Sequence, residues 1–76
     1  MNEVYKINEI KNHKVVTSNF PEGLTITLNE YINKEGTMYK ILLFNHEEGE
    51  QSEYGQYKTK DGSLNDYEGI MRLYVK

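Results

Sequence analysis

The stretch ITLNEYINKEGTMYKILLFN, residues 26–45, decides the fold. Its first half alternates apolar and polar residues, and a short polar run ending at Gly36 leads into a second apolar segment, as in a β-hairpin. We expect a three-residue loop that Gly36 closes with a left-handed bulge, which sets Asn33 opposite Thr37. The remaining predicted pairs are Ile32 with Met38, Glu30 with Lys40, Leu28 with Leu42, Ile26 with Phe44, Tyr31 with Tyr39 and Thr27 with Leu43. A register shifted by one residue would mix the two faces of the second strand, so we reject it.

The second strand of this hairpin, residues 37–45, carries apolar side chains on both of its faces. A strand of this kind is typical of the middle of a sheet that is covered on both sides. The covering segment could be residues 14–20, or residues 69–76, where Ile70, Leu73 and neighbouring apolar residues predict a terminal strand. A second subunit is the competing explanation for the two apolar faces.

Four glycines follow an acidic residue at a constant spacing, with Gly23, Gly36, Gly49 and Gly62 each 13 residues after the one before. The residues between them do not resemble one another, so the spacing indicates the turns of a meander and not a repeated unit. We expect type I turns closed by glycine at residues 33–36, 46–49 and 59–62. Pro21, beside the first glycine, is expected to break the chain before the hairpin.

The N-terminal segment, residues 2–11, supports two interpretations. Val4, Ile7 and Ile10 recur at helical spacing, whereas Tyr5 and Ile7 alternate as in a strand. We favour a strand, with a short helix as the alternative.

Together these patterns predict an all-β or mainly β fold in a single small β-rich domain, residues 1–76. We expect an antiparallel meander of about five strands that curls into a small barrel or pairs as a homodimer. A chain of 76 residues buries only about 60% of its unfolded surface, so its core is thin.

Composition restricts the class of function. The chain has no cysteine, which excludes a disulfide framework and a thiol nucleophile and favours a cytoplasmic location. Charged residues near the start exclude the apolar core of a signal peptide, and no stretch is long enough to span a membrane. A net charge of -3 makes nucleic acid a disfavoured partner.

No pattern in the chain predicts catalysis, a metal or another cofactor. His13 and His46 fall in predicted turns among polar residues, which indicates solvated side chains. Residues 61–65 begin like a calcium loop, but Asp66 and Arg72 stand where that loop needs glycine and glutamate. No serine lies in a nucleophile elbow and no glycine-rich phosphate loop occurs, so we expect a protein that is not an enzyme.

Tyrosine is the compositional exception, with seven residues in a short chain. Tyr54, Tyr57 and Tyr67 lie in polar segments and are expected to be partly exposed. Exposed tyrosines are enriched in interfaces, so we predict a non-catalytic protein-binding module that acts through a tyrosine patch or an edge strand. The competing interpretation is that these rings are half-buried against a thin sheet.

Two other functions remain open. One is a small nucleic-acid-binding β-barrel in which tyrosines stack on bases beside Lys58, Lys60 and Arg72. The other is an acidic inhibitor of the kind encoded by phages, which mimics a nucleic-acid backbone. It requires a row of carboxylates drawn from Glu47, Glu48, Glu50, Glu53, Asp61, Asp66 and Glu68.

Overall fold

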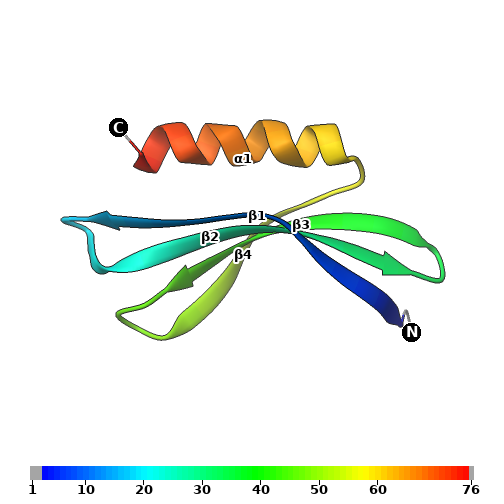
Figure 1. Ribbon diagram of the computed structural model, residues 1–76, viewed down its shortest axis with the longest axis horizontal. Helices are drawn as coiled ribbons and strands as arrows, with labels where there is room; N and C mark the ends of the chain where they lie inside the picture. Colours follow the sequence, from blue (N-terminus) through cyan, green and yellow to red (C-terminus); the bar gives the residue numbers. More distant parts are fainter. Residues whose placement is uncertain (1–2, 76) are drawn as a thin grey trace.

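The computed structural model describes residues 3–75; Asn2 and Lys76, at the ends of two segments discussed above, lie outside the described residues. Four antiparallel strands form one sheet in the order β1-β2-β3-β4, and one helix follows them (Figure 1). The elements are β1 (Val4–Thr17), β2 (Phe20–Asn33), β3 (Gly36–Asn45), β4 (Glu50–Tyr57) and α1 (Lys60–Tyr74). The mainly β meander is thus confirmed. The sheet has four strands where about five were expected, and it is open, so the barrel, one of the two expected arrangements, does not form; pairing as a dimer stays a prediction.

The helix α1 replaces the predicted terminal strand at residues 69–76. It begins at Thr59, whose Oγ1 accepts a hydrogen bond of 3.1 Å from the backbone N–H of Gly62 and caps the first turn. Gly62 therefore belongs to a helix start and not to the predicted hairpin turn. Ser63, Tyr67 and Ile70, at intervals of four and three residues, form the buried face of α1. This spacing outweighs the alternating apolar residues near the C-terminus, which suggested a strand.

The core lies between α1 and one face of the sheet. Its buried apolar members are Val15, Leu24, Ile26, Leu28, Tyr39, Ile41, Tyr67 and Ile70. They come from β1, β2, β3 and α1, so the helix and three strands share one apolar layer. The opposite face of the sheet has no covering element within the described chain (Figure 1).

The β2–β3 hairpin forms, but its register is the shifted one, and the predicted register is wrong. Asn33 pairs with Gly36 across a loop of two residues, and the Asn33 Oδ1 accepts a hydrogen bond of 2.9 Å from the N–H of Glu35. Leu28 accordingly pairs with Ile41, and the other core pair is Ile26 with Leu43. Because β3 is apolar on both faces, a slip by one residue costs it little. The helix decides between the registers, since it covers the face that carries these pairs.

The N-terminal segment is a strand, as favoured from the sequence, and β1 pairs with β2 along its length. Residues 14–20 therefore extend the sheet at its edge and do not cover it. His13 lies within β1 and not in a turn, so its predicted position is wrong. Pro21 lies inside β2 and does not break the chain before the hairpin as predicted; it falls between Phe20 and Leu24, at a shift in the pairing with β1.

The turn at residues 46–49 is confirmed. Gly49 has a φ of 68°, in the left-handed region, and its N–H donates to the carbonyl of Asn45 at 2.8 Å. Asn45 also accepts hydrogen bonds at its Oδ1 from the N–H groups of Glu47 (2.9 Å) and Glu48 (3.4 Å). The acidic loop is therefore hydrogen-bonded at three of its residues to Asn45, which ends β3.

The molecule is a slab with dimensions of 42 × 25 × 15 Å. Its radius of gyration is 13.2 Å, whereas a compact chain of this length has about 11.4 Å. The larger radius of gyration reflects a flat molecule of two layers, the sheet and the helix α1, where thicker domains have three layers. No helix among residues 3–75 is long and apolar enough to cross a membrane.

Candidate functional site

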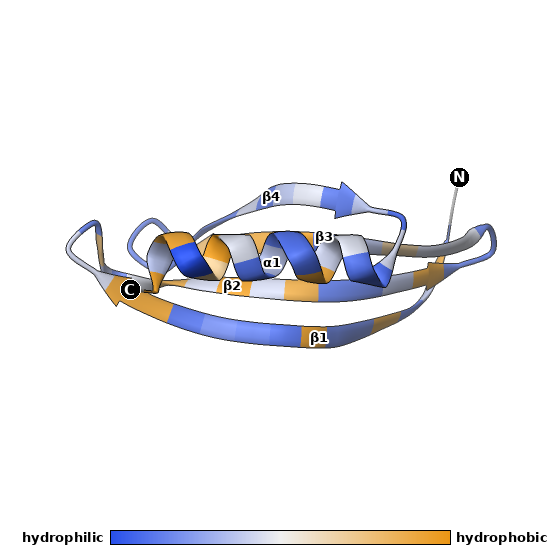
Figure 2. Ribbon diagram, turned by 90° about the horizontal axis from the view of Figure 1, so that it is seen from above, coloured by the Kyte–Doolittle hydropathy of each residue, from blue (hydrophilic) through white to orange (hydrophobic). Residues whose placement is uncertain are grey.

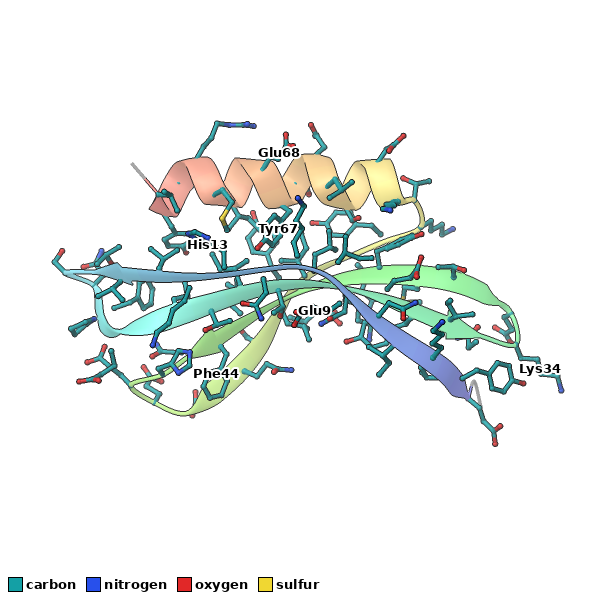
Figure 3. All side chains as sticks on the ribbon, viewed as in Figure 1. Glu9, His13, Lys34, Phe44, Tyr67 and Glu68 are labelled. Carbon is teal, nitrogen blue, oxygen red and sulfur yellow. The ribbon has the colours of Figure 1, made fainter. Side chains whose placement is uncertain are left out.

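The three predicted tyrosines lie in different surroundings. Tyr67 is buried between α1 and the sheet, and its hydroxyl donates a 3.0 Å hydrogen bond to the carbonyl of Ile26 (Figure 3). Tyr57 is half-buried and donates to the Asp66 Oδ2 at 2.7 Å, and burial together with this carboxylate raises the pKa of Tyr57 to about 12. Tyr54 is 49% exposed on β4. Only Tyr54 of the three therefore offers a largely free ring.

The predicted carboxylates also separate. Glu47 and Glu48 lie in the β3–β4 loop, and Glu50 begins β4. Glu53 projects from the sheet face opposite α1, with its Oε1 3.4 Å from the Nζ of Lys40. The remaining acids, Asp61, Asp66 and Glu68, belong to α1. Glu68 points away from the sheet (Figure 3).

A groove beside the acidic loop brings several of these features together. It is a cavity of about 260 Å³ at the end of the molecule where α1 finishes, and we call it the end groove. Its apolar lining consists of Phe20, Leu24, Leu43 and Tyr74, and its acidic lining consists of Glu48 and Glu50. Phe20 and Tyr74 pack edge to face, with ring centroids 5.9 Å apart, and together form one wall of the end groove.

A second cavity, of about 480 Å³, lies at the same end of the molecule and is also lined by Phe20 and Tyr74. Val16 and Leu73 line it and are 64% and 65% exposed, respectively. Figure 2 shows apolar residues at the end of β1 and at the end of α1, which lie close to one another. Large exposed apolar residues gathered in this way are typical of interaction surfaces.

The lining of the end groove is acidic. The end groove has two glutamates in its lining, and no lysine or arginine among the described residues lines either cavity. The C-terminus of α1, at Tyr74, adds the partial negative charge of its last carbonyl groups. Arg72 lies in the last turn but is not part of either lining. A ligand of the end groove should therefore carry positive charge beside an apolar group.

Neither histidine lines the end groove. The Nε2 of His46 lies 2.6 Å from the Oγ1 of Thr25, and its ring packs edge to face on Phe44 at 4.7 Å. His13 is exposed on β1, on the side of the sheet that faces α1 (Figure 3). Within the part of the chain that the structure describes, no three histidine, aspartate or glutamate side chains gather as a metal site.

The fold and this end together define a class of protein: an open-faced, two-layer β-meander with one covering helix and an apolar, acid-lined groove. The chain matches no family model, no curated protein and no solved structure.

Sequence reasoning found Glu48 and Glu50 but missed the apolar lining of the end groove. That lining comes from β2, β3 and α1, so the helix had to be found first. The signal was present in the spacing of Ser63, Tyr67, Ile70 and Tyr74 along one helical face.

Proposed function

We propose that this chain is a non-catalytic protein-binding module whose binding surface is the end groove. The partner is a protein segment that presents an apolar side chain next to lysine or arginine. One observation carries the proposal: an apolar lining of two aromatic and two aliphatic residues adjoins Glu48 and Glu50 in a single cavity.

The size of the end groove favours a peptide side chain over a small molecule. Its volume of about 260 Å³ lies below the roughly 300–1,000 Å³ of most small-molecule sites. One leucine or phenylalanine side chain fits such a volume, and its burial contributes about 1.5–3 kcal/mol. Single-site affinity should therefore be weak, with a Kd on the order of 0.1–1 mM.

Charge selects the class of partner. Like charges that face one another across an interface are unfavourable, so Glu48 and Glu50 disfavour nucleic acid, an acidic protein and a second copy of the same surface. A basic segment gains from the same residues and also from the C-terminus of α1. Binding of a basic segment requires only the two carboxylates that line the end groove and no row of acids spaced like phosphates.

Strand addition, the other binding mode expected from the sequence, is opposed by both edges of the sheet. β4 has only 8 residues and an irregular register opposite Ile41 and Leu42. β1 has three register shifts and carries Lys6, Lys11 and Lys14. Short, bulged or lysine-bearing edges are the features that protect sheets from additional strands.

The proposal is tested by NMR titration of the ¹⁵N-labelled protein with two end-blocked peptides, KLFKK and the charge-reversed ELFEE. We expect KLFKK alone to shift amide resonances at Phe20, Leu24 and Leu43, with an affinity that falls as salt is added. Equal shifts with ELFEE, or shifts confined to other parts of the molecule, would contradict the proposal.

A matched pair of variants tests the acidic lining. Glu50→Lys reverses one charge in the end groove, and Glu68→Lys makes the same change on the outer side of α1. We expect Glu50→Lys to weaken KLFKK binding about tenfold, because it replaces an attraction by a repulsion. Glu68→Lys should leave the Kd within about twofold. Equal losses in both variants would show that only net charge matters.

A further inference from the structure

The sheet face opposite α1, here called the open face, carries an apolar surface of its own. Strand alternation and the observed register place Ile7, Tyr31 and Met38 in one row across β1, β2 and β3. Leu42 and Phe44 lie on the same face of β3, and Phe44 points away from the helix (Figure 3). Ile7 is 58% exposed and the others are half-buried. The inner strand β3 thus has an apolar face that no described element covers.

The overall dimensions are those of a thin, elongated molecule. The accessible surface is 5291 Å², whereas a compact monomer of 9.0 kDa exposes about 4,850 Å². The radius of gyration exceeds the compact value in the same sense. A larger accessible surface and a larger radius of gyration are both expected when a two-layer slab is one half of a thicker structure.

The open face is large enough for a stable interface. Four strands spaced ~4.8 Å apart, with ~3.3 Å per residue, project an area of roughly 700 Å². Side chains add relief to this projection, and a stable complex buries about 800 Å² of accessible surface per partner. One sheet face of a second copy therefore matches the area that a dimer needs.

Charge distinguishes the open face from the end groove. The register places Glu9, Lys14, Lys40 and Glu53 on the open face, two acids and two bases. Lys40 lies 3.4 Å from Glu53, and its Nζ lies 5.2 Å from the centroid of the Tyr31 ring. A face whose charges balance does not repel its own copy, whereas a strongly charged partner gains nothing from it.

We propose that the occupant of the open face is a second copy of this chain. The two sheets pack face to face about a twofold axis, ~10 Å apart and with strands at an angle of about 30°. The rows that contain Met38, Leu42 and Phe44 form the centre of the interface. This inference does not depend on the end groove, which lies at one end of the slab and stays accessible.

The first test is light scattering and sedimentation of the full chain from about 1 µM to about 1 mM. We expect the mass to rise from 9.0 kDa to twice that value. Phe44→Glu should raise the dimer dissociation constant at least ~100-fold, because it buries like charges against the twofold copy. Val75→Glu, a comparable change at an exposed position just after α1 and outside both cavities, should leave it unchanged. A mass of one chain at every concentration would overturn the proposal, as would a dimer that folded Phe44→Glu preserves.

A second measurement covers the case in which Phe44→Glu does not fold. The chain contains no cysteine, so a single introduced cysteine is the only thiol that a cross-linker can modify. Thr27→Cys lies opposite Leu42 on the open face, and Glu68→Cys lies on the outer side of α1. With a short bismaleimide we expect covalent dimers of Thr27→Cys and none of Glu68→Cys. Equal cross-linking at both positions, or cross-linking at neither, would overturn the assignment of the interface.

Discussion

At the scale of single residues, the hydroxyl of Tyr67 connects α1 to the central part of the sheet through its bond to the Ile26 carbonyl. Tyr67→Phe removes the donor and leaves that carbonyl buried with one partner fewer. We expect the free energy of unfolding to fall by about 1 kcal/mol in urea denaturation. Tyr54→Phe, at an exposed ring, is the matched control and should change it by less than ~0.5 kcal/mol. An equal loss in both variants would mean that the buried bond adds no stability.

Also at this scale, Tyr57 makes stability depend on pH in the alkaline range. Its pKa of about 12 in the folded chain lies above the ordinary value of 10.0. The fold therefore favours the protonated phenol, and the stabilisation is complete below pH 10 and is lost as the pH rises through 12. We expect Asp66→Asn to lower the pKa of Tyr57 in an absorbance titration of the phenolates. If Asp66→Asn leaves the titration unaltered, Asp66 does not contribute to the raised pKa of Tyr57.

At the scale of elements, the cap at Thr59 determines where α1 begins. Thr59→Ala removes the side-chain acceptor for the N–H of Gly62, and we expect a loss of about 1 kcal/mol in the free energy of unfolding. Asn65→Ala, at an exposed position inside the same helix, should not destabilise the protein by more than ~0.5 kcal/mol. If Thr59→Ala has no effect, tertiary packing alone fixes the start of the helix.

The secondary-structure elements also show which parts of the fold could be predicted from the sequence. The hairpin was predictable because the glycine after its turn and the alternation at the start of β2 are local signals, whereas the N-terminal strand was only favoured over a short helix. The register of β2 against β3 was not, since β3 is apolar on both faces and only the packing of α1 selects one pairing. The helix was missed because Met71, Leu73 and Val75 alternate as in a strand, and the cap at Thr59 was overlooked. The end groove depends on that helix, so only its acidic residues could be named in advance.

At the scale of the whole molecule, the two proposed surfaces have a joint consequence. A twofold dimer through the open face carries two end grooves, and a ligand with two basic segments can occupy both. Its second binding step is then intramolecular, which can raise the overall affinity by roughly 10²–10⁴-fold without a new contact. A flexible Gly/Ser linker of about 30 residues has an average span of roughly 30 Å and can extend much further, against a slab 42 Å long.

We therefore expect two KLFKK segments joined by such a linker to bind the natural chain at least ~10-fold more tightly than the single peptide, measured by calorimetry above the dimer dissociation constant. Phe44→Glu leaves the lining of the end groove intact but removes the second groove. It should bind the linked and single peptides with affinities per segment that agree within about twofold. If linking the two peptides raises the affinity as much for Phe44→Glu as for the natural chain, the increase arises within one chain. The dimer then has no part in binding.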